Sequence, residues 1–177
     1  MEKRNRIIRK ASLPEDAEGI MAVFSAAKAI MRSSGNVNQW KSGYPSLEAV
    51  QADIDRQGSY VIEENRMIVS YFAFLNSPEP TYARIYDGEW LDDSLPYHVI
   101  HRIASYPDVH GIFASIIEFC AAIEPNLRID THRDNHITQH IILKHGFTCC
   151  GIIHLASGDE RLAYQRIKLV TNRDRFH

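Results

Sequence analysis

The stretch from residue 97 to residue 147 constrains the fold more than any other part of the chain, because it reads as strand, turn, helix and strand. Residues 99–105 are a β-branched and aliphatic run, which is typical of a buried strand. After a Pro-Asp break, Gly111 opens an apolar stretch at helical spacing, and residues 127–131 return to a strand pattern. Two strands joined by a helix in this way pair in parallel, with a right-handed crossover.

The turn at Gly111 is the first candidate for chemistry. A turn between a strand and a helix directs free backbone N–H groups and a helix N-terminus at one point beyond the strand end, which favours a phosphate group. A glycine before a helix is also common in plain turns. Its position inside a βαβ unit favours the phosphate site.

The remaining elements follow from caps, turns and periodicity. A capping box of Ser12 and Glu15 predicts a helix that starts at Ser12 and ends near Gly35. Ser46 predicts the cap of a shorter helix, and Asn135 the cap of a helix from residue 136. Further strands are expected at residues 6–10, 59–63, 66–75, 149–155 and 161–167.

Length and charge exclude several classes of protein. With 177 residues, we expect one domain over residues 1–177, with a C-terminal tail at 168–177. Lys and Arg total 20 and Asp and Glu total 22, so the net charge of −2 gives no electrostatic case for nucleic acid. The charged N-terminus is no signal peptide, and no segment is long and apolar enough for a membrane span. The three cysteines, two of them adjacent, suit free thiols in a cytoplasmic protein.

Three short motifs, taken in order, resemble a known family. Gly111 after a strand, Asn135 after the next strand, and KHGF at 144–147 closing the next helix are similar to the GNAT superfamily of acyl-CoA-dependent N-acetyltransferases. The N-terminal IIRKASLPEDAEGIMAVF resembles that family's first strand and helix, so the likeness spans about residues 6–167. A bacterial subgroup of predicted acetyltransferases is also similar. The resemblance implies an α/β fold: a mixed, mostly antiparallel sheet of six or seven strands flanked by helices, with a parallel βαβ cofactor site.

The resemblance also implies an activity. An acetyl group would pass from acetyl-CoA to a primary amine of an unidentified small molecule or peptide, by direct attack in a ternary complex of a monomer or homodimer. Acetyl-CoA would lie between strands 99–105 and 127–131, where a backbone N–H stabilises the developing oxyanion. The cofactor-binding residues would be Ile103, Ala104, Ser105, Val109, His110, Gly111, Ile112, Phe113, Ala114, Asn135 and Lys144.

Three positions depart from the family pattern. Asp108 replaces a basic or amide side chain, and Phe113 replaces a small residue in the phosphate turn. Ile142 occupies the position of a tyrosine that often protonates the departing thiolate; a thiol with a pKa near ~8.5 needs little such help. These departures keep open a non-catalytic acyl-CoA-binding or regulatory module. An interaction domain without a cofactor is a third reading.

The acceptor ammonium, with a pKa near ~10, must lose a proton before it attacks. An imidazole can take that proton near neutral pH. His101 and His132 are the candidates because both lie beside the expected strand ends, although a structural histidine is the commoner case. His136 and His140 are four residues apart on a helix but lack the glutamate of HExxH, so no metal is expected.

Aromatic residues in two loops are candidates for the acceptor pocket, with Glu89 or Asp87 holding the amine. Packing in the core is the alternative for at least half of these aromatic residues. The predicted substrate-binding residues are Trp40, Tyr44, Tyr86, Glu89 and Trp90.

Overall fold

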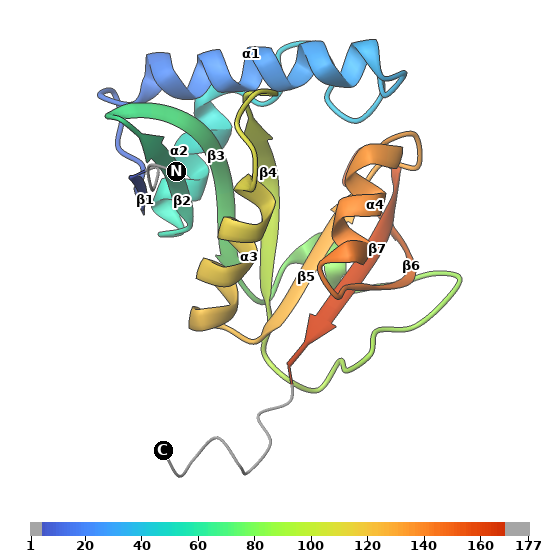
Figure 1. Ribbon diagram of the computed structural model, residues 1–177. Helices are drawn as coiled ribbons and strands as arrows, with labels where there is room; N and C mark the ends of the chain where they lie inside the picture. Colours follow the sequence, from blue (N-terminus) through green and yellow to red (C-terminus); the bar gives the residue numbers. More distant parts are fainter. Residues whose placement is uncertain (1–4, 169–177) are drawn as a thin grey trace, which may run out of the picture.

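The computed structural model describes residues 5–168 (Figure 1). The elements are, in chain order, β1 (Arg6–Lys10), α1 (Ala17–Ser33), α2 (Leu47–Asp55), β2 (Ser59–Glu64), β3 (Met67–Asn76), the 3₁₀ turn η1 (Pro80–Tyr82), β4 (His98–Ser105), α3 (Ile112–Ile123), β5 (Asn126–Thr131), α4 (His136–Lys144), β6 (Thr148–His154) and β7 (Glu160–Ile167). The predicted tail at 168–177 lies outside these residues, apart from Lys168.

One mixed sheet of seven strands forms the centre, in the order β1-β2-β3-β4-β5-β7-β6. The β4–β5 pair is parallel and the other neighbouring pairs are antiparallel. The predicted α/β fold, with a parallel βαβ unit at its centre, is therefore confirmed. The strand assignments made from the sequence agree with the structure to within about two residues at each end.

Helices cover both faces of the sheet. Ile20 and Phe24 of α1 and Val50 of α2 pack with Tyr71 of β3 on one face. The other face carries α3 and α4, which pack against Phe72, the next residue of β3. Because successive strand side chains point to opposite faces, these neighbours mark two separate cores. Figure 1 shows α1 lying across one end of the sheet and α3 and α4 on the same side of it.

The predicted start of α1 at Ser12 is wrong, because the helix begins at Ala17. The Asp16 carboxylate accepts the Ser12 N–H at 2.8 Å and two hydrogen bonds from the Arg9 guanidinium, each 2.8 Å. These bonds hold residues 12–16 as a turn. The other two predicted caps are confirmed: Ser46 Oγ accepts the Ala49 N–H of α2, and Asn135 Oδ1 caps α4.

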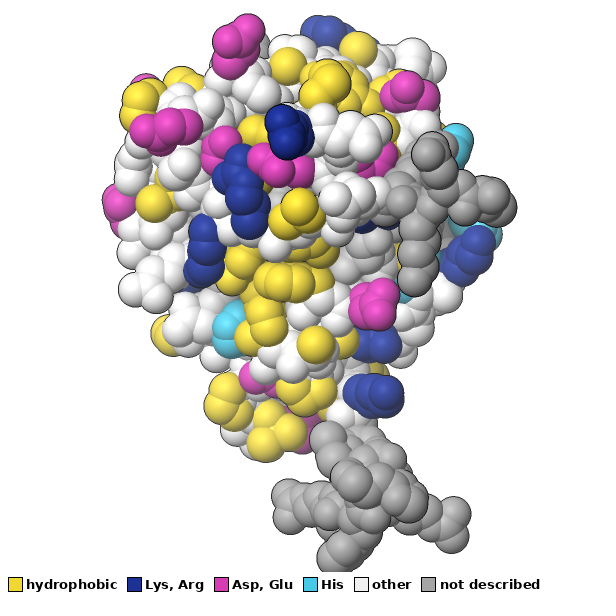
Figure 2. Space-filling view, turned by 60° about the vertical axis from the view of Figure 1, so that its left-hand side comes forward, with side chains coloured by type: hydrophobic (Ala, Val, Ile, Leu, Met, Phe, Trp, Pro, Cys, Tyr) yellow, Lys and Arg dark blue, Asp and Glu magenta, His cyan; other side chains and the backbone are white. Residues whose placement is uncertain are grey.

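The surface is mixed in charge. On the face seen in Figure 2, Lys and Arg side chains are interspersed with Asp and Glu rather than gathered in one broad basic area. Within residues 5–168, no helix combines the length and the apolar character that crossing a membrane requires.

Candidate active site

The parallel pair opens in its second half. The ladder between β4 and β5 ends at Ile100 opposite Ile129, and the two ribbons then diverge (Figure 1). Beyond Ile100, the edge of β4 that faces β5 has no strand partner, so its backbone N–H and C=O groups are available to another molecule.

A cavity of about 1050 Å³ occupies this opening. Its walls come from α1, the α1–α2 loop, β4, the turn before α3, β5, α4 and the β6–β7 connection. Every residue that the sequence predicts for the cofactor lines it, as do His101, Trp40 and Tyr44. The structure thus brings together residues that lie more than a hundred positions apart in the chain.

A bulge in β4 shapes the wall of the cavity. Ala73 of β3 lies opposite His101, whereas Tyr71 lies opposite Ala104, so β4 carries one extra residue between these pairs. Arg102 stands in the bulge with a left-handed backbone, φ +52°. A non-glycine residue rarely adopts that conformation unless its surroundings impose it.

The Arg102 side chain supplies the restraint. Its guanidinium forms a two-point ion pair with Asp53 of α2, and its Nη1 donates to the Tyr44 hydroxyl at 2.9 Å. The Asp53 carboxylate also accepts from the Tyr71 hydroxyl at 2.7 Å and is 2% exposed. This network ties the bulge to α2 and to β3.

The turn before α3 has the form expected of an anion site. Gly111 is the N-cap of α3 and has a left-handed backbone, φ +74°, which favours glycine. The first N–H groups of the helix have no acceptor inside the helix. They belong to Ile112, Phe113 and Ala114, which line the cavity.

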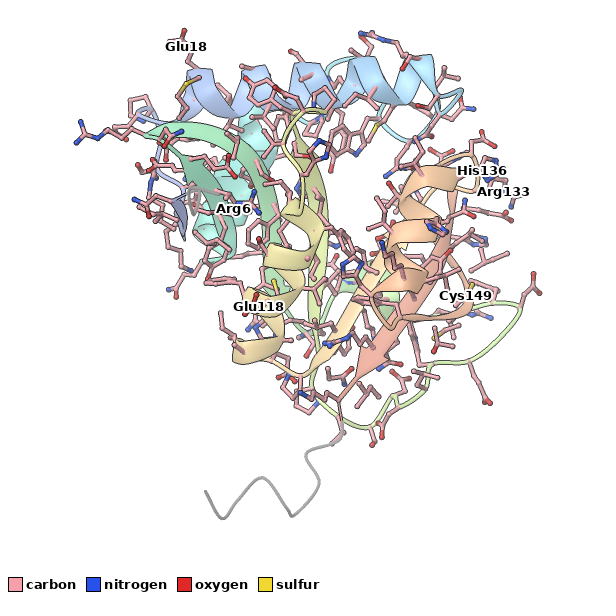
Figure 3. The ribbon with its side chains drawn as sticks, in the orientation of Figure 1. Arg6, Glu18, Glu118, Arg133, His136 and Cys149 are labelled. Atoms are coloured by element: carbon pink, nitrogen blue, oxygen red, sulfur yellow. The ribbon has the colours of Figure 1, made fainter. Side chains whose placement is uncertain are left out.

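Arg6 of β1 holds this turn from behind. It donates to the carbonyls of His110 and Gly111 at 2.9 and 3.1 Å and to Ser115 Oγ at 2.8 Å, while pairing with Glu64. Figure 3 shows Arg6 on β1, at the side of α3. Because Arg6 engages the two carbonyls, the turn is fixed before any ligand binds.

The structure shows where the three residues that depart from the family pattern lie relative to the cavity. Asp108 is exposed and is not among the residues that line the cavity. Phe113 packs edge-on against His145 of α4, with ring centroids 4.9 Å apart. Ile142 is fully buried in the core under α4 and is also outside the lining. The tyrosine position therefore carries a core side chain here.

Three basic or potentially basic side chains lie at the anion-site end of the cavity: His110 next to Gly111, and Lys144 and His145 at the end of α4, where His145 contacts Phe113. Lys144 is exposed and lies in the last turn of α4. Cations at this position favour phosphate oxygens.

The far side of the cavity holds an acid–base cluster. His101 Nδ1 lies 3.5 Å from Asp130 Oδ1, and the Tyr82 hydroxyl donates to the same oxygen at 2.5 Å. Burial raises the pKa of Asp130, but the close contact with His101, the hydrogen bond from Tyr82 and the charge of Arg161 outweigh it, so the pKa lies below its ordinary value. Burial, followed by the charge of Asp130, raises the pKa of Tyr82.

The contacts indicate the roles within the cluster. Tyr82 remains a donor and Asp130 an ionised acceptor. A proton on His101 Nδ1 faces Asp130, which leaves Nε2 as the basic nitrogen. A carboxylate that orients an imidazole in this way is a common arrangement for proton transfer.

His132 has a different setting. It is not part of the cavity lining, and its Nδ1 accepts the Asp134 N–H at 3.1 Å. Burial, together with the charge of Arg161, lowers the pKa of His132. Of the two predicted histidines, only His101 therefore reaches the cavity.

Gln39 closes the cavity from the α1–α2 loop. Its Oε1 accepts from Asn135 Nδ2 at 2.9 Å and from Thr131 Oγ1 at 3.2 Å. Its backbone carbonyl accepts from Arg161 at 3.0 Å. The Asn135 side chain thus caps α4 and anchors this loop at the same time.

The predicted acceptor aromatics divide into two groups. Trp40 and Tyr44 line the cavity, whereas Tyr86, Glu89 and Trp90 do not. Trp90 is buried between the Tyr82 ring and the Arg128 guanidinium, which lies 3.9 Å from its centroid. Tyr86 stacks on His154 beside β6, and Glu89 is exposed. Trp90 therefore packs against the sheet, and the part of the 77–97 loop that does line the cavity is Glu79 and Thr81.

Sequence reasoning missed Asp130, Gln39, Arg6 and Arg161. Only Asp130 could have been found from the sequence, since pairing the two parallel strands end to end sets it beside His101.

No group of three or more His, Cys, Asp or Glu side chains in the described part of the chain could hold a metal ion. His136 lines the cavity, near Arg133 at the start of α4, whereas His140 does not (Figure 3).

No protein-family model matches the sequence, and no curated protein sequence matches it. Among solved structures, a GNAT-family acetyltransferase from Streptococcus agalactiae is 34% identical with a TM-score of 0.79, over 93% of this chain and 96% of that one. Two further GNAT-family acetyltransferases share the fold. The one from Listeria monocytogenes is 16% identical with a TM-score of 0.65, over 91% of this chain and 94% of that one. The one from Bacillus cereus is 17% identical with a TM-score of 0.57, over 93% of this chain and 98% of that one. The chain belongs to the GNAT family of acetyltransferases.

Proposed function

We propose that the protein transfers an acetyl group from acetyl-CoA to the primary amine of a small molecule, by direct attack in a ternary complex. The observation that carries this is the composition of one cavity. It combines an anion-binding turn at one end, an unpaired strand edge in the middle, and the His101–Asp130 pair on the other side.

The residues present fit acetyl-CoA. The N–H groups after Gly111, with Lys144, would hold the pyrophosphate. The free edge of β4 at residues 103–105 would pair with the amide groups of the pantetheine arm, as an added strand would. Acetyl-CoA supplies the acyl group already activated as a thioester.

The chain's own residues would then manage the protons. His101 Nε2 takes a proton from the acceptor ammonium while Asp130 stabilises the imidazolium. The amine nitrogen would bond to the carbonyl carbon and lose its second proton to solvent as the carbon–sulfur bond breaks. A backbone N–H of residues 103–105 stabilises the negative charge on the carbonyl oxygen. Because Ile142 offers no proton, the departing thiolate takes one from solvent.

A non-catalytic acyl-CoA-binding module is the second candidate. The buried Ile142 favours it, because the usual general acid is missing. Both candidates predict acetyl-CoA binding, which raises the melting temperature. They differ in turnover.

The test mixes the protein with acetyl-CoA and a panel of primary amines. Thiol release is followed continuously, and the N-acetylated product is identified by mass spectrometry. We expect product in a one-to-one ratio with thiol for at least one amine, and a rate at least about a hundredfold lower in His101→Gln. Acetyl-CoA binding without turnover on any amine would favour the binding module, and no binding would refute both.

A further inference from the structure

Arg161 of β7 is a buried cation in the wall of the cavity. It is 5% exposed and belongs to the cavity lining. Its Nη1 donates to the Glu160 carbonyl at 2.9 Å and its Nη2 to the Gln39 carbonyl at 3.0 Å. Within residues 5–168, no carboxylate comes within ion-pair distance of it. A buried charge without an opposite charge is costly unless a ligand supplies one.

The other arginine and the lysine on the same side of the cavity are already paired. Arg102 is paired with Asp53, and Lys41 lies 3.0 Å from Asp159. A guanidinium carries five N–H donors, and Arg161 uses two of its nitrogens on backbone carbonyls. Arg161 therefore retains donor capacity. Asp130 and Asp159 lie near enough to feel its charge, but neither forms an ion pair with it.

Arg161 lies on the same face of the sheet as the proposed base. Asp130 pairs with Ala163 across β5 and β7, so Arg161, two residues from Ala163, shares their face at a distance of roughly 7 Å along the strand. His101 is beside Asp130 on that face. The turn at Gly111 and α3 belong to the opposite face, so Arg161 is separated from the anion site for phosphate.

We infer that Arg161 binds a carboxylate of the acceptor, so that the acceptor is a small amino acid or a close analogue. This rests on the proposed acetyl transfer. The planar guanidinium matches a carboxylate by two parallel hydrogen bonds. With the carboxylate on Arg161, the amine of the same small molecule lies toward His101, where its proton must leave.

The first experiment needs no variant. It compares kcat/KM for matched pairs: phenylalanine with phenethylamine, leucine with isopentylamine, and histidine with histamine. β-Alanine and γ-aminobutyrate vary the spacing between amine and carboxylate. We expect kcat/KM for the best amino acid to exceed that for its decarboxylated partner by roughly a hundredfold or more. The partner has no carboxylate, so Arg161 has no anion to bind. Equal or better use of the amines throughout would overturn the inference.

The second experiment removes the charge. In Arg161→Met, the amino acid should lose its advantage and approach the rate of its amine, while acetyl-CoA affinity stays at the parent value. Arg161→Lys should retain part of the preference. Arg133→Met is the matched control, since Arg133 is exposed, paired with Glu160 and outside the cavity. It should leave the preference intact. An unchanged preference in Arg161→Met, or an equal loss on acids and amines, would refute the proposed role.

A binding measurement separates this inference from the proposed function. The melting temperature of the CoA-saturated protein is recorded with the same acids and amines. A rise with an acid and not with its amine, lost in Arg161→Met, supports carboxylate binding even if no acetyl transfer occurs. Transfer to amines with no preference for acids would leave the proposed function standing and refute the inference.

Discussion

Replacing Asp53 by Asn removes the carboxylate that anchors the β4 bulge. Asp53 is 2% exposed and receives a two-point ion pair from Arg102 and a hydrogen bond from Tyr71. The substitution leaves the Arg102 side chain, which is 17% exposed, without a compensating charge. Because that guanidinium also holds a left-handed backbone in place, the loss acts on the wall of the cavity itself.

The expected cost follows from burial. Removing one partner of a buried ion pair destabilises a protein by roughly 3–5 kcal/mol, because the remaining charge stays desolvated. For a chain of this length, each kcal/mol lowers the melting temperature by about 2–4 °C, so Asp53→Asn should melt roughly 6–20 °C below the parent. A bulge that relaxes would also lower acetyl-CoA affinity, since residues 103–105 follow it directly.

The assay is urea unfolding, followed by circular dichroism, for Asp53→Asn and for Glu160→Gln. Glu160 pairs with Arg133 in an exposed ion pair, with side chains 47% and 59% exposed. Breaking an exposed pair costs at most about 1 kcal/mol. Equal losses in the two variants, with unchanged acetyl-CoA affinity, would refute the role given to the Asp53 network.

Three further predictions concern the turn and the first loop. Gly111→Trp should abolish acetyl-CoA binding in calorimetry while circular dichroism shows a folded protein; unchanged affinity would make the turn purely structural. Arg6→Met should weaken acetyl-CoA binding about tenfold by releasing the two carbonyls that it holds, and an unchanged Kd would contradict this. Hydrogen bonds from Arg9 lower the pKa of Asp16, so the ionised carboxylate stabilises the fold above about pH 4 and loses this effect as the pH falls. Asp16→Asn should therefore lower the free energy of unfolding by about 1–3 kcal/mol at pH 7 and hardly at all near pH 3; a deficit that does not depend on pH would contradict this.

The sequence predicted elements whose signals are local. The aliphatic run of β4, the cap at Asn135 and the glycine at the start of α3 each appear within a few residues. The start of α1 was missed because Ser12 and Glu15 match a capping box. In the structure, Asp16 is the residue that precedes the helix, and its carboxylate is held by Arg9, a contact that no local pattern reveals.

The candidate site was predictable only in part for the same reason. Residues of one βαβ unit lie together whenever that unit forms, so the sequence could predict that the proposed cofactor residues would line one cavity. Gln39 and Arg161 meet through a contact across 122 residues, and nothing in either local sequence indicates it. The sequence placed Trp90 in the acceptor pocket because an aromatic-rich loop can line such a pocket. The same composition also suits a loop packed against the sheet, which is where the structure places Trp90.

The dependence of kcat/KM on pH tests the central claim most directly, once an acceptor is known. It is measured for the parent, for His101→Gln and for His132→Gln. We predict an acidic limb in the parent that disappears in His101→Gln, with a loss of about a hundredfold or more on the plateau. His132→Gln should keep the limb, because that imidazole lies outside the cavity lining. An acidic limb that persists in His101→Gln, with a rate near that of the parent, would contradict the assignment of His101 as the base.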